Sequence, residues 1–232
     1  MRFATCDGLL LEEEEEKEPR SFFPRGALCS LAALAALATV TEPVTGHMFR
    51  ERMCFEQSDD VDVTHCPRLC GVGTRQKRLV GIKQLHVYAL GLYVSEDFAP
   101  SPQDARPWDE ELVSRSDVDK IISIVISSSL VNRKKFVGAL DDALLPVVES
   151  TSSEATLCRF RALFDNVTFK KGLHLDFYLR DGSLTAKVDG HTLGTLDDEA
   201  FSRAFAGVYL GAAPVSPKAK EAFRRGLESW KV

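Results

Sequence analysis

The chain has 232 residues, of which 44% are hydrophobic and 27% are charged, and its formal net charge at pH 7 is -5. This length and this composition are typical of one globular domain or of two small ones. The small negative net charge gives no reason to expect nucleic acid or an anionic membrane as a partner.

The N-terminal residues differ in composition from the rest of the chain. An acidic run lies at Glu12–Glu16, and the apolar stretch LCSLAALAALATV follows at residues 28–40. This stretch is shorter than the roughly 20 residues that a membrane-spanning helix needs, and the acidic run before it is unusual for a signal or transit peptide. We therefore predict a flexible or targeting extension at residues 1–46, no stable membrane insertion, and one folded domain at residues 47–232.

Six cysteines are spaced irregularly along the chain, which is too long for a small disulfide-stapled domain. Cys66 and Cys70, with His65 beside them, supply only one of the two regular ligand pairs that a zinc finger needs. We therefore expect reduced thiols in a reducing compartment and no bound metal.

From residue 47 onward the pattern is one of strands followed by helices. RLVGIKQLHVYALGLYV, residues 78–94, and DKIISIVISSSLV, residues 119–131, are rich in β-branched, aromatic and aliphatic residues and predict strands. Residues 132–150 and 152–167 carry apolar side chains at helical spacing, and Asn132 is in position to cap the first of these two helices.

The second half of the chain repeats this order. LHLDFYLRDGSLTAKVDGHTLGTL, residues 173–196, contains two Asp-Gly pairs between alternating runs, which predicts a β-meander. Helices are predicted at residues 197–211, ending on Gly211, and at residues 216–230, where Ser216 and Pro217 form a typical helix start. Strands followed by helices, twice, favour an α+β fold whose antiparallel sheet carries helices on one face.

The stretch Gly71-Val72-Gly73-Thr74-Arg75 precedes the first strand, and we interpret it as a glycine-rich loop. It lacks the third glycine of a dinucleotide loop and the Gly-Lys-Ser/Thr core of a phosphate loop, so no nucleotide cofactor is predicted. An arginine binds carboxylates through paired hydrogen bonds, and the hydroxyl of Tyr88 adds one more donor. The alternative is that Arg75 is an ordinary surface residue and Tyr88 fills space.

Strand alternation places Tyr88 on the same face as Gln84 and His86. The opposite face, which includes Leu85 and Val87, is more regularly apolar, and we predict that it is the core side. Tyr88 then lies on a face that is polar at one end and apolar at the other, which suits an amphipathic ligand with an anionic head.

Two segments resemble the chalcone isomerase fold family. Gly71–Arg75 followed by VYALGLYV resembles the start of that fold, and YLGAAPVSPKAKEAF, residues 209–223, resembles the start of its last helix. The resemblance covers about residues 47–232. It implies an α+β fold with an open-faced antiparallel sheet covered on one side by helices. The family contains plant isomerases that close the flavanone ring of a chalcone and a non-catalytic plastid branch that binds fatty acids.

By this resemblance, the isomerases use an arginine, which is kept here as Arg75, and four further polar residues. Those four positions fall at Tyr88, near Val131 and Gly138, and at Val208. The last three have side chains that cannot donate a hydrogen bond to a developing enolate. The resemblance therefore favours a protein that is not an enzyme. A chalcone–flavanone isomerase, which is an intramolecular lyase, remains an alternative, and so does a non-enzymatic auxiliary partner of flavonoid synthesis.

The resemblance to the non-catalytic branch implies that Arg75 and Tyr88 hold the carboxylate of a free fatty acid, without a cofactor or metal. It also implies a role in plastid fatty-acid metabolism, in the chloroplast stroma; the cytoplasm is the alternative, and protein partners stay open. The acyl chain is expected in an apolar tunnel. The tunnel residues predicted are Leu90, Leu92, Ile124, Ile126, Phe136, Leu140, Val208 and Tyr209.

Overall fold

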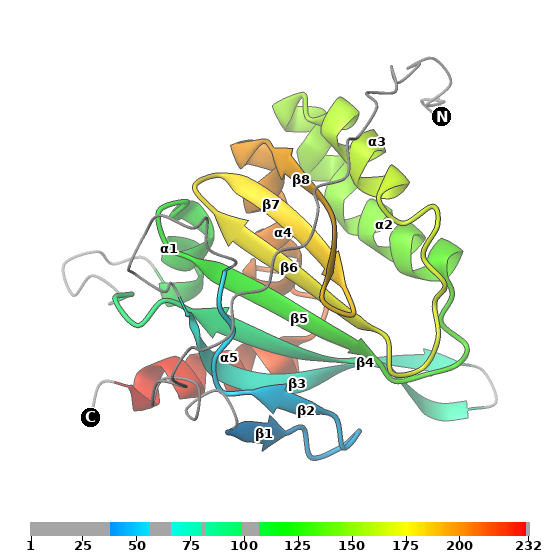
Figure 1. The fold of residues 1–232 in the computed structure, drawn as a ribbon, viewed down its shortest axis with the longest axis vertical. Coiled ribbons are helices and arrows are strands. Elements are labelled where there is room, and N and C mark those ends of the chain that lie inside the picture. The colour runs from blue at the N-terminus through cyan, green and yellow to red at the C-terminus, as the bar shows by residue number, and fades with distance from the viewer. Residues whose placement is uncertain (1–37, 56–65, 80–81, 99–106, 231–232) are drawn as a thin grey trace, which may run out of the picture.

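The computed structural model describes residues 38–55, 66–79, 82–98 and 107–230. Its main element is a six-stranded antiparallel sheet in which every strand pairs with the next along the chain, in the order β3-β4-β5-β6-β7-β8 (Figure 1). The six strands are β3 (Arg68–Leu79), β4 (Ile82–Val94), β5 (Lys120–Ile126), β6 (His174–Arg180), β7 (Ser183–Val188) and β8 (His191–Asp197). Two short strands, β1 (Thr39–Thr41) and β2 (Met48–Arg50), form a separate antiparallel pair.

One face of the large sheet carries the helices. Those in the described residues are α1 (Trp108–Ser114), α2 (Arg133–Thr151), α3 (Glu154–Ala162), α4 (Glu199–Leu210) and α5 (Pro217–Ser229). Their buried side chains form one cluster with the sheet residues that face them, and this cluster is the main core. The predicted α+β architecture, an antiparallel sheet covered on one side by helices, is confirmed.

Two helix starts and two turns follow from local signals in the amino-acid sequence. The Oδ1 atom of Asn132 accepts a hydrogen bond from the backbone N–H of Lys135 at 3.0 Å, so Asn132 caps α2. Ser216 caps α5 in the same way, with Pro217 as the first helical residue. Both Asp-Gly pairs form hairpin turns in which the aspartate and the glycine have positive φ. The strand predicted at residues 119–131, however, ends at Ile126.

The prediction of which face of β4 forms the core is wrong. Tyr88 and Leu90 point toward the helices and belong to the main core, whereas Ala89 and Tyr93 belong to a smaller cluster beneath β2. Phe49 of β2 lies in that smaller cluster and is only 2% exposed. Because both faces of β4 are buried at its centre, apolar alternation alone does not show which face carries the helices.

Residues 71–75 form part of strand β3, so their interpretation as a loop is also wrong. Gly71 and Gly73 lie directly under helix α5. A Cβ on Gly71 would lie 2.8 Å from the carbonyl oxygen of Ala222, and one on Gly73 would lie 2.6 Å from the Cβ of Ala219. The glycines therefore allow a helix to lie against the strand, and they do not make a turn.

The cysteines also differ from expectation. Cys54 and Cys66 form a disulfide bond, and Cys158 is disulfide-bonded as well. Cys70 is a free, buried thiol whose pKa is raised by that burial. The expectation of reduced thiols is therefore wrong for three cysteines, because spacing along the chain does not show which residues the fold brings together. Within the described residues, no group of His, Cys, Asp and Glu side chains could hold a metal ion.

The predicted domain boundary between residues 46 and 47 stays a prediction. Strand β1 lies before this boundary and pairs with β2, which lies after it. In the described part of the chain, none of the helices has the length and apolar character needed to cross a bilayer.

Candidate functional site

A cleft of about 610 Å³ lies between one end of strands β3 and β4 and the first half of helix α2. Its volume is in the range of small-molecule binding pockets. The strands contribute Arg75, Lys77, Leu85, Val87 and Tyr88 to its lining. The turn before α2 and the helix itself contribute Leu130, Val131, Asn132, Lys134, Lys135, Phe136, Gly138, Ala139 and Asp142.

The strand wall of the cleft depends on a β-bulge. Arg75 pairs with Tyr88, but the next residue, Gln76, pairs with His86, so Val87 is an extra residue in β4. A bulge of this kind interrupts the regular alternation of side chains and redirects those on one side of it.

The bulge explains why one part of the strand prediction is wrong. Leu85 and Val87 were expected on the face opposite Tyr88, and all three line the same cleft. Beyond the bulge the alternation is shifted by one residue, so the apolar side chains of Leu85 and Val87 lie on the side of the Tyr88 ring.

Arg75 and Tyr88 lie directly opposite each other on their two strands. The Nη1 atom of Arg75 donates a hydrogen bond to the Tyr88 hydroxyl at 3.4 Å, and the guanidinium carbon lies 5.6 Å from the centroid of the ring. Tyr88 is 1% exposed and Arg75 is partly buried. No carboxylate among the described residues pairs with Arg75. A guanidinium that contacts only a neutral phenol has its strongest hydrogen-bond donors available for an anion.

A second buried hydroxyl lies next to this pair. Burial raises the pKa of Tyr88, although the Arg75 charge lowers it in part, so the phenol stays protonated at neutral pH. Burial and the neighbouring Tyr88 also raise the pKa of Tyr209. The two hydroxyls approach each other, but among the described residues the Tyr209 hydroxyl makes no hydrogen bond of regular geometry. Arg75 and Tyr88 are both hydrogen-bond donors in the lining of the cleft, a pair that suits one carboxylate, and the Tyr209 hydroxyl is buried beside Tyr88.

The structure brings together part of the predicted site. Arg75, Tyr88 and Phe136 line the cleft, and so do Val131 and Gly138, two of the positions matched to polar groups of the isomerases. The remaining predicted residues are buried in the main core and do not line the cleft; these are Leu90, Leu92, Ile124, Ile126, Leu140, Val208 and Tyr209. Their role as a tunnel for an acyl chain stays a prediction.

Sequence reasoning missed several residues that line the cleft. Leu85 and Val87 gave no signal, because their orientation depends on the bulge. Lys134 and Lys135 did give a signal in the sequence, because they follow Arg133 directly after the helix cap. A helix start favours acidic side chains, so three basic residues there are unusual.

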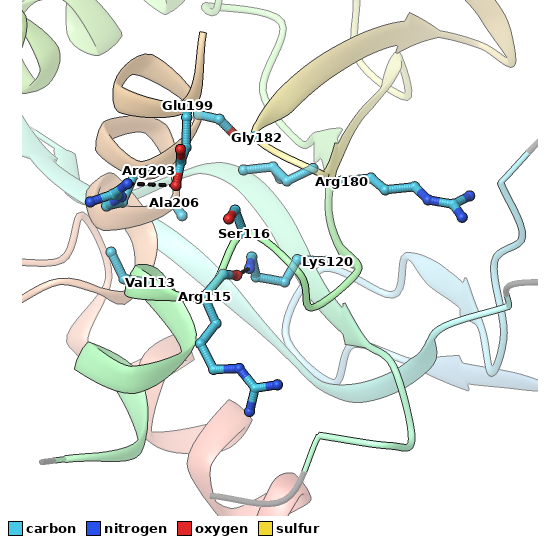
Figure 2. Close-up of a pocket in the computed structure, with 11 residues that line it drawn as sticks. Val113, Arg115, Ser116, Lys120, Arg180, Gly182, Glu199, Arg203 and Ala206 are labelled. Carbon is cyan, nitrogen blue, oxygen red and sulfur yellow. Dashed lines mark hydrogen bonds and ion pairs between the residues drawn. The ribbon is translucent and has the colours of Figure 1, made fainter. Parts of the chain in front are cut away.

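A second, much smaller cavity lies at the other end of β5 (Figure 2). Its volume is about 10 Å³, enough for roughly one water molecule. Lys120 is 4% exposed there, and its Nζ atom donates a hydrogen bond to the carbonyl oxygen of Arg115. Burial lowers the pKa of Lys120 to about 8. This cavity is too small for an organic ligand. Two other hollows, of about 260 and 300 Å³, are smaller than the cleft beside α2, which we take as the candidate site.

Comparison with known proteins is consistent with this geometry. The model of a family described as chalcone isomerase-like matches residues 62–223. Fatty-acid-binding protein 1 of Arabidopsis thaliana is 23% identical over 202 residues, which cover 80% of this chain and 69% of that protein. Fatty-acid-binding protein 2 of the same plant is 26% identical over 175 residues, which cover 68% of this chain and 44% of that protein.

The fold is also similar to a solved structure. The crystal structure of an Arabidopsis thaliana fatty-acid binding protein matches with a TM-score of 0.68 and 22% sequence identity. The match covers 83% of this chain and 98% of that one. At this identity the likeness shows a shared fold and nothing finer.

Proposed function

We propose, from the premise that this chain belongs to the chalcone isomerase-like family, that it is a non-catalytic protein that binds a free fatty acid. The observation that carries the proposal is the Arg75–Tyr88 pair. The guanidinium of Arg75 is partly buried and lies at the wall of a largely apolar cleft. Among the described residues, it contacts the neutral phenol of Tyr88 and no carboxylate. Two similar proteins of Arabidopsis thaliana, both named fatty-acid-binding proteins, support the proposal.

The ligand carboxylate is placed at Arg75, which donates two hydrogen bonds, and at the Tyr88 hydroxyl, which donates a third. The acyl chain extends along the apolar side chains of Leu85, Val87 and Phe136. Each methylene buried contributes ~0.8 kcal/mol, so a dodecyl chain supplies on the order of 8 kcal/mol before the cost of ordering it. The carboxylate contacts then set the orientation of the ligand.

Ring closure of a chalcone is not part of the proposal. Val131 and Gly138 line the cleft at positions where the isomerases, by resemblance, carry polar groups. Neither side chain can donate a hydrogen bond to an enolate, so the cleft lacks two of the polar groups that the isomerases, by resemblance, use to stabilise that intermediate.

The test is laurate binding to the delipidated full chain, measured by calorimetry. We expect wild-type protein to bind laurate and Arg75→Ala to weaken binding at least tenfold, which corresponds to about 1.4 kcal/mol. Arg203→Ala is the matched control, because Arg203 is an exposed arginine that pairs with Glu199 on α4. Absence of laurate binding in the wild type, or equal losses in the two variants, would disprove the proposal.

The proposal extends to location: the protein acts in the chloroplast stroma, in plastid fatty-acid metabolism. Residues 1–46, which precede the predicted domain, are the segment available for targeting. A fluorescent fusion of the full chain should accumulate in plastids, and a fusion that lacks residues 1–46 should stay in the cytoplasm. If both fusions stay in the cytoplasm, the stromal location is wrong.

A further inference from the structure

The charges around the mouth of the cleft are mostly of one sign. Lys77, Lys134 and Lys135 line the cleft and are exposed, and within the described residues none of them forms an ion pair with a carboxylate. Asp142 is the single acidic residue in the lining. With Arg75, the mouth carries four cations and one anion. This local excess of positive charge contrasts with the net charge of -5 for the whole chain.

The position of two of these lysines works against the stability of helix α2. They lie in the first turn of the helix, which contains no acidic residue. The backbone N–H groups at a helix start already carry partial positive charge, so acidic side chains stabilise this position and basic ones destabilise it. Arg133 is compensated by Asp165, but Lys134 and Lys135 are not. Folding therefore does not account for the charge of Lys134, and that of Lys135 is met only by the carbonyl oxygen of Leu130, whereas an external anion suits both.

One exposed apolar side chain, that of Leu130, lies among the lysines at the mouth of the cleft. Leu130 is 48% exposed and lies in the turn before α2, in the lining of the cleft. Its backbone N–H donates a hydrogen bond to the hydroxyl of Ser128 at 3.1 Å, and its carbonyl oxygen accepts one from Nζ of Lys135 at 2.8 Å. The N–H of Val131 also donates to the carbonyl oxygen of Ser128 at 3.2 Å. The turn is fixed by its own hydrogen bonds, so the exposure of Leu130 is built into the fold.

We propose that this mouth docks on the surface of an anionic lipid bilayer and opens the cleft onto it. Lys77, Lys134 and Lys135 contact the anionic headgroups, and Leu130 enters the boundary between headgroups and acyl chains. Figure 1 shows the start of α2 and the hairpin end of β3 and β4 on the same side of the molecule, and residues of all three elements line the cleft. The net charge does not oppose docking, because charges farther than about 8 Å from the surface are screened at physiological salt.

Docking of this kind differs from membrane insertion and needs no ligand in the cleft. The proposal therefore goes beyond fatty-acid binding and is tested separately from it. A weakly soluble acyl ligand partitions into bilayers, and a cleft that opens at the bilayer surface can take it up without passage through water.

The test is sedimentation of the full chain with vesicles of phosphatidylcholine alone and with vesicles of equimolar phosphatidylcholine and phosphatidylglycerol. We expect binding to the anionic vesicles and little to the neutral ones. One lysine at an anionic surface changes the partition coefficient by roughly fivefold, so Lys77→Gln combined with Lys134→Gln should lower it by at least about tenfold. Leu130→Ser alone should lower it by roughly threefold.

The control variant combines Arg203→Gln with Arg225→Gln and removes the same number of positive charges. Arg203 lines the small cavity at the other end of β5, and Arg225 is an exposed residue of α5. We expect this variant to bind anionic vesicles like the wild type. Equal losses in the two double variants, equal binding to both kinds of vesicle, or no binding by the wild type would overturn the proposal.

Laurate calorimetry on the same proteins keeps the two proposals apart. Tyr88→Phe should weaken laurate binding but sediment with anionic vesicles like the wild type, because it removes no charge from the mouth of the cleft. A wild type that binds anionic vesicles but not laurate would disprove the proposed function and leave the docking surface standing.

Discussion

Two helices cover the same pair of strands in opposite ways. Helix α5 lies so close to β3 that a Cβ on Gly226 would be 1.4 Å from the carbonyl oxygen of Cys70. Helix α2 leaves a cleft of about 610 Å³ beside β3 and β4, and a Cβ on Gly138, which lines that cleft, would meet nothing within 4 Å. Helix α5 thus packs closely against the strand pair, and helix α2 leaves the strand surface open to a ligand.

The charges follow the same division. On α5, Arg224 forms ion pairs of 2.6 Å with both Glu221 and Glu228, and Lys220 pairs with Asp109 of α1. At the cleft, the described residues provide no carboxylate partner for Arg75. The ion pairs of α5 are satisfied inside the molecule, whereas Arg75 and the exposed lysines of the cleft lining are left for partners outside it.

The largest effect is expected where the packing is closest. Gly226→Ala forces α5 away from β3, and overpacking of this severity should lower the free energy of unfolding by about 3 kcal/mol or more. Gly207→Ala on α4 is the control, because a Cβ there meets nothing within 4 Å. It should raise the free energy of unfolding by up to about 1 kcal/mol through helix propensity. Urea unfolding of the two variants measures both values, and a neutral Gly226→Ala would contradict the close contact.

The next effect concerns the buried cation at the far end of β5. Burial lowers the pKa of Lys120 from 10.5 to about 8, so the folded state binds this proton less tightly than the unfolded state does. The resulting loss of folding stability is fully present below the pKa that Lys120 has in the folded state. It disappears as the pH rises toward the pKa of the unfolded state. Between about pH 7 and pH 10, the wild type should therefore gain about 2 kcal/mol of stability relative to Lys120→Met.

Urea unfolding of both proteins at the two pH values measures this gain. An equal difference between wild type and Lys120→Met at both pH values would show that Lys120 has an ordinary pKa.

A smaller effect is expected on the open side of the strand pair. Tyr88→Phe keeps the buried ring and removes one hydrogen-bond donor to the carboxylate, so laurate should bind about fivefold more weakly, a loss of about 1 kcal/mol. Calorimetry measures the affinity, and an unchanged thermal midpoint shows that the ring still packs. If laurate binds to Tyr88→Phe as it does to the wild type, the phenol does not contact the ligand.

The smallest effect is expected at Gly138. Gly138→Ala adds one methyl group to an open part of the cleft, so it should raise the free energy of unfolding by about 0.5–1 kcal/mol and change laurate affinity by less than about twofold. Unfolding and calorimetry on this variant test both expectations. A large destabilisation would mean that α2 packs as closely as α5, and the comparison between the two helices would fail.

The parts of the fold that could be predicted depend on interactions within a few residues. Asn132 caps a helix through the N–H three residues later, and each Asp-Gly pair forms its turn locally, so the sequence carries the whole signal. The chain order of these elements was then sufficient to indicate an open-faced antiparallel sheet covered by helices.

The errors arise where partners lie far apart in the chain. Gly73 permits either a turn or a close approach, and the segment that approaches it, at Ala219, comes from the end of the chain. Val87 becomes an extra residue only because of the way β4 pairs with β3. The residue types at Arg75 and Tyr88 suggested an anion-binding pair, and the family resemblance favoured that interpretation over the alternative. The geometry of the pair follows from strand pairing that no local pattern reveals.

The bulge at Val87 also bears on how such a cleft can change in evolution. Deletion of this one residue would restore regular pairing beyond Tyr88 and would leave Leu85 on the same face as Tyr88, because Gln76 already pairs with His86 and Lys77 with Leu85. The mouth of the cleft would then lose the apolar side chain of Val87, while Arg75 and Tyr88 would still pair across the two strands. A change in chain length of a single codon is thus a route to a new ligand preference that leaves Arg75 and Tyr88 unaltered.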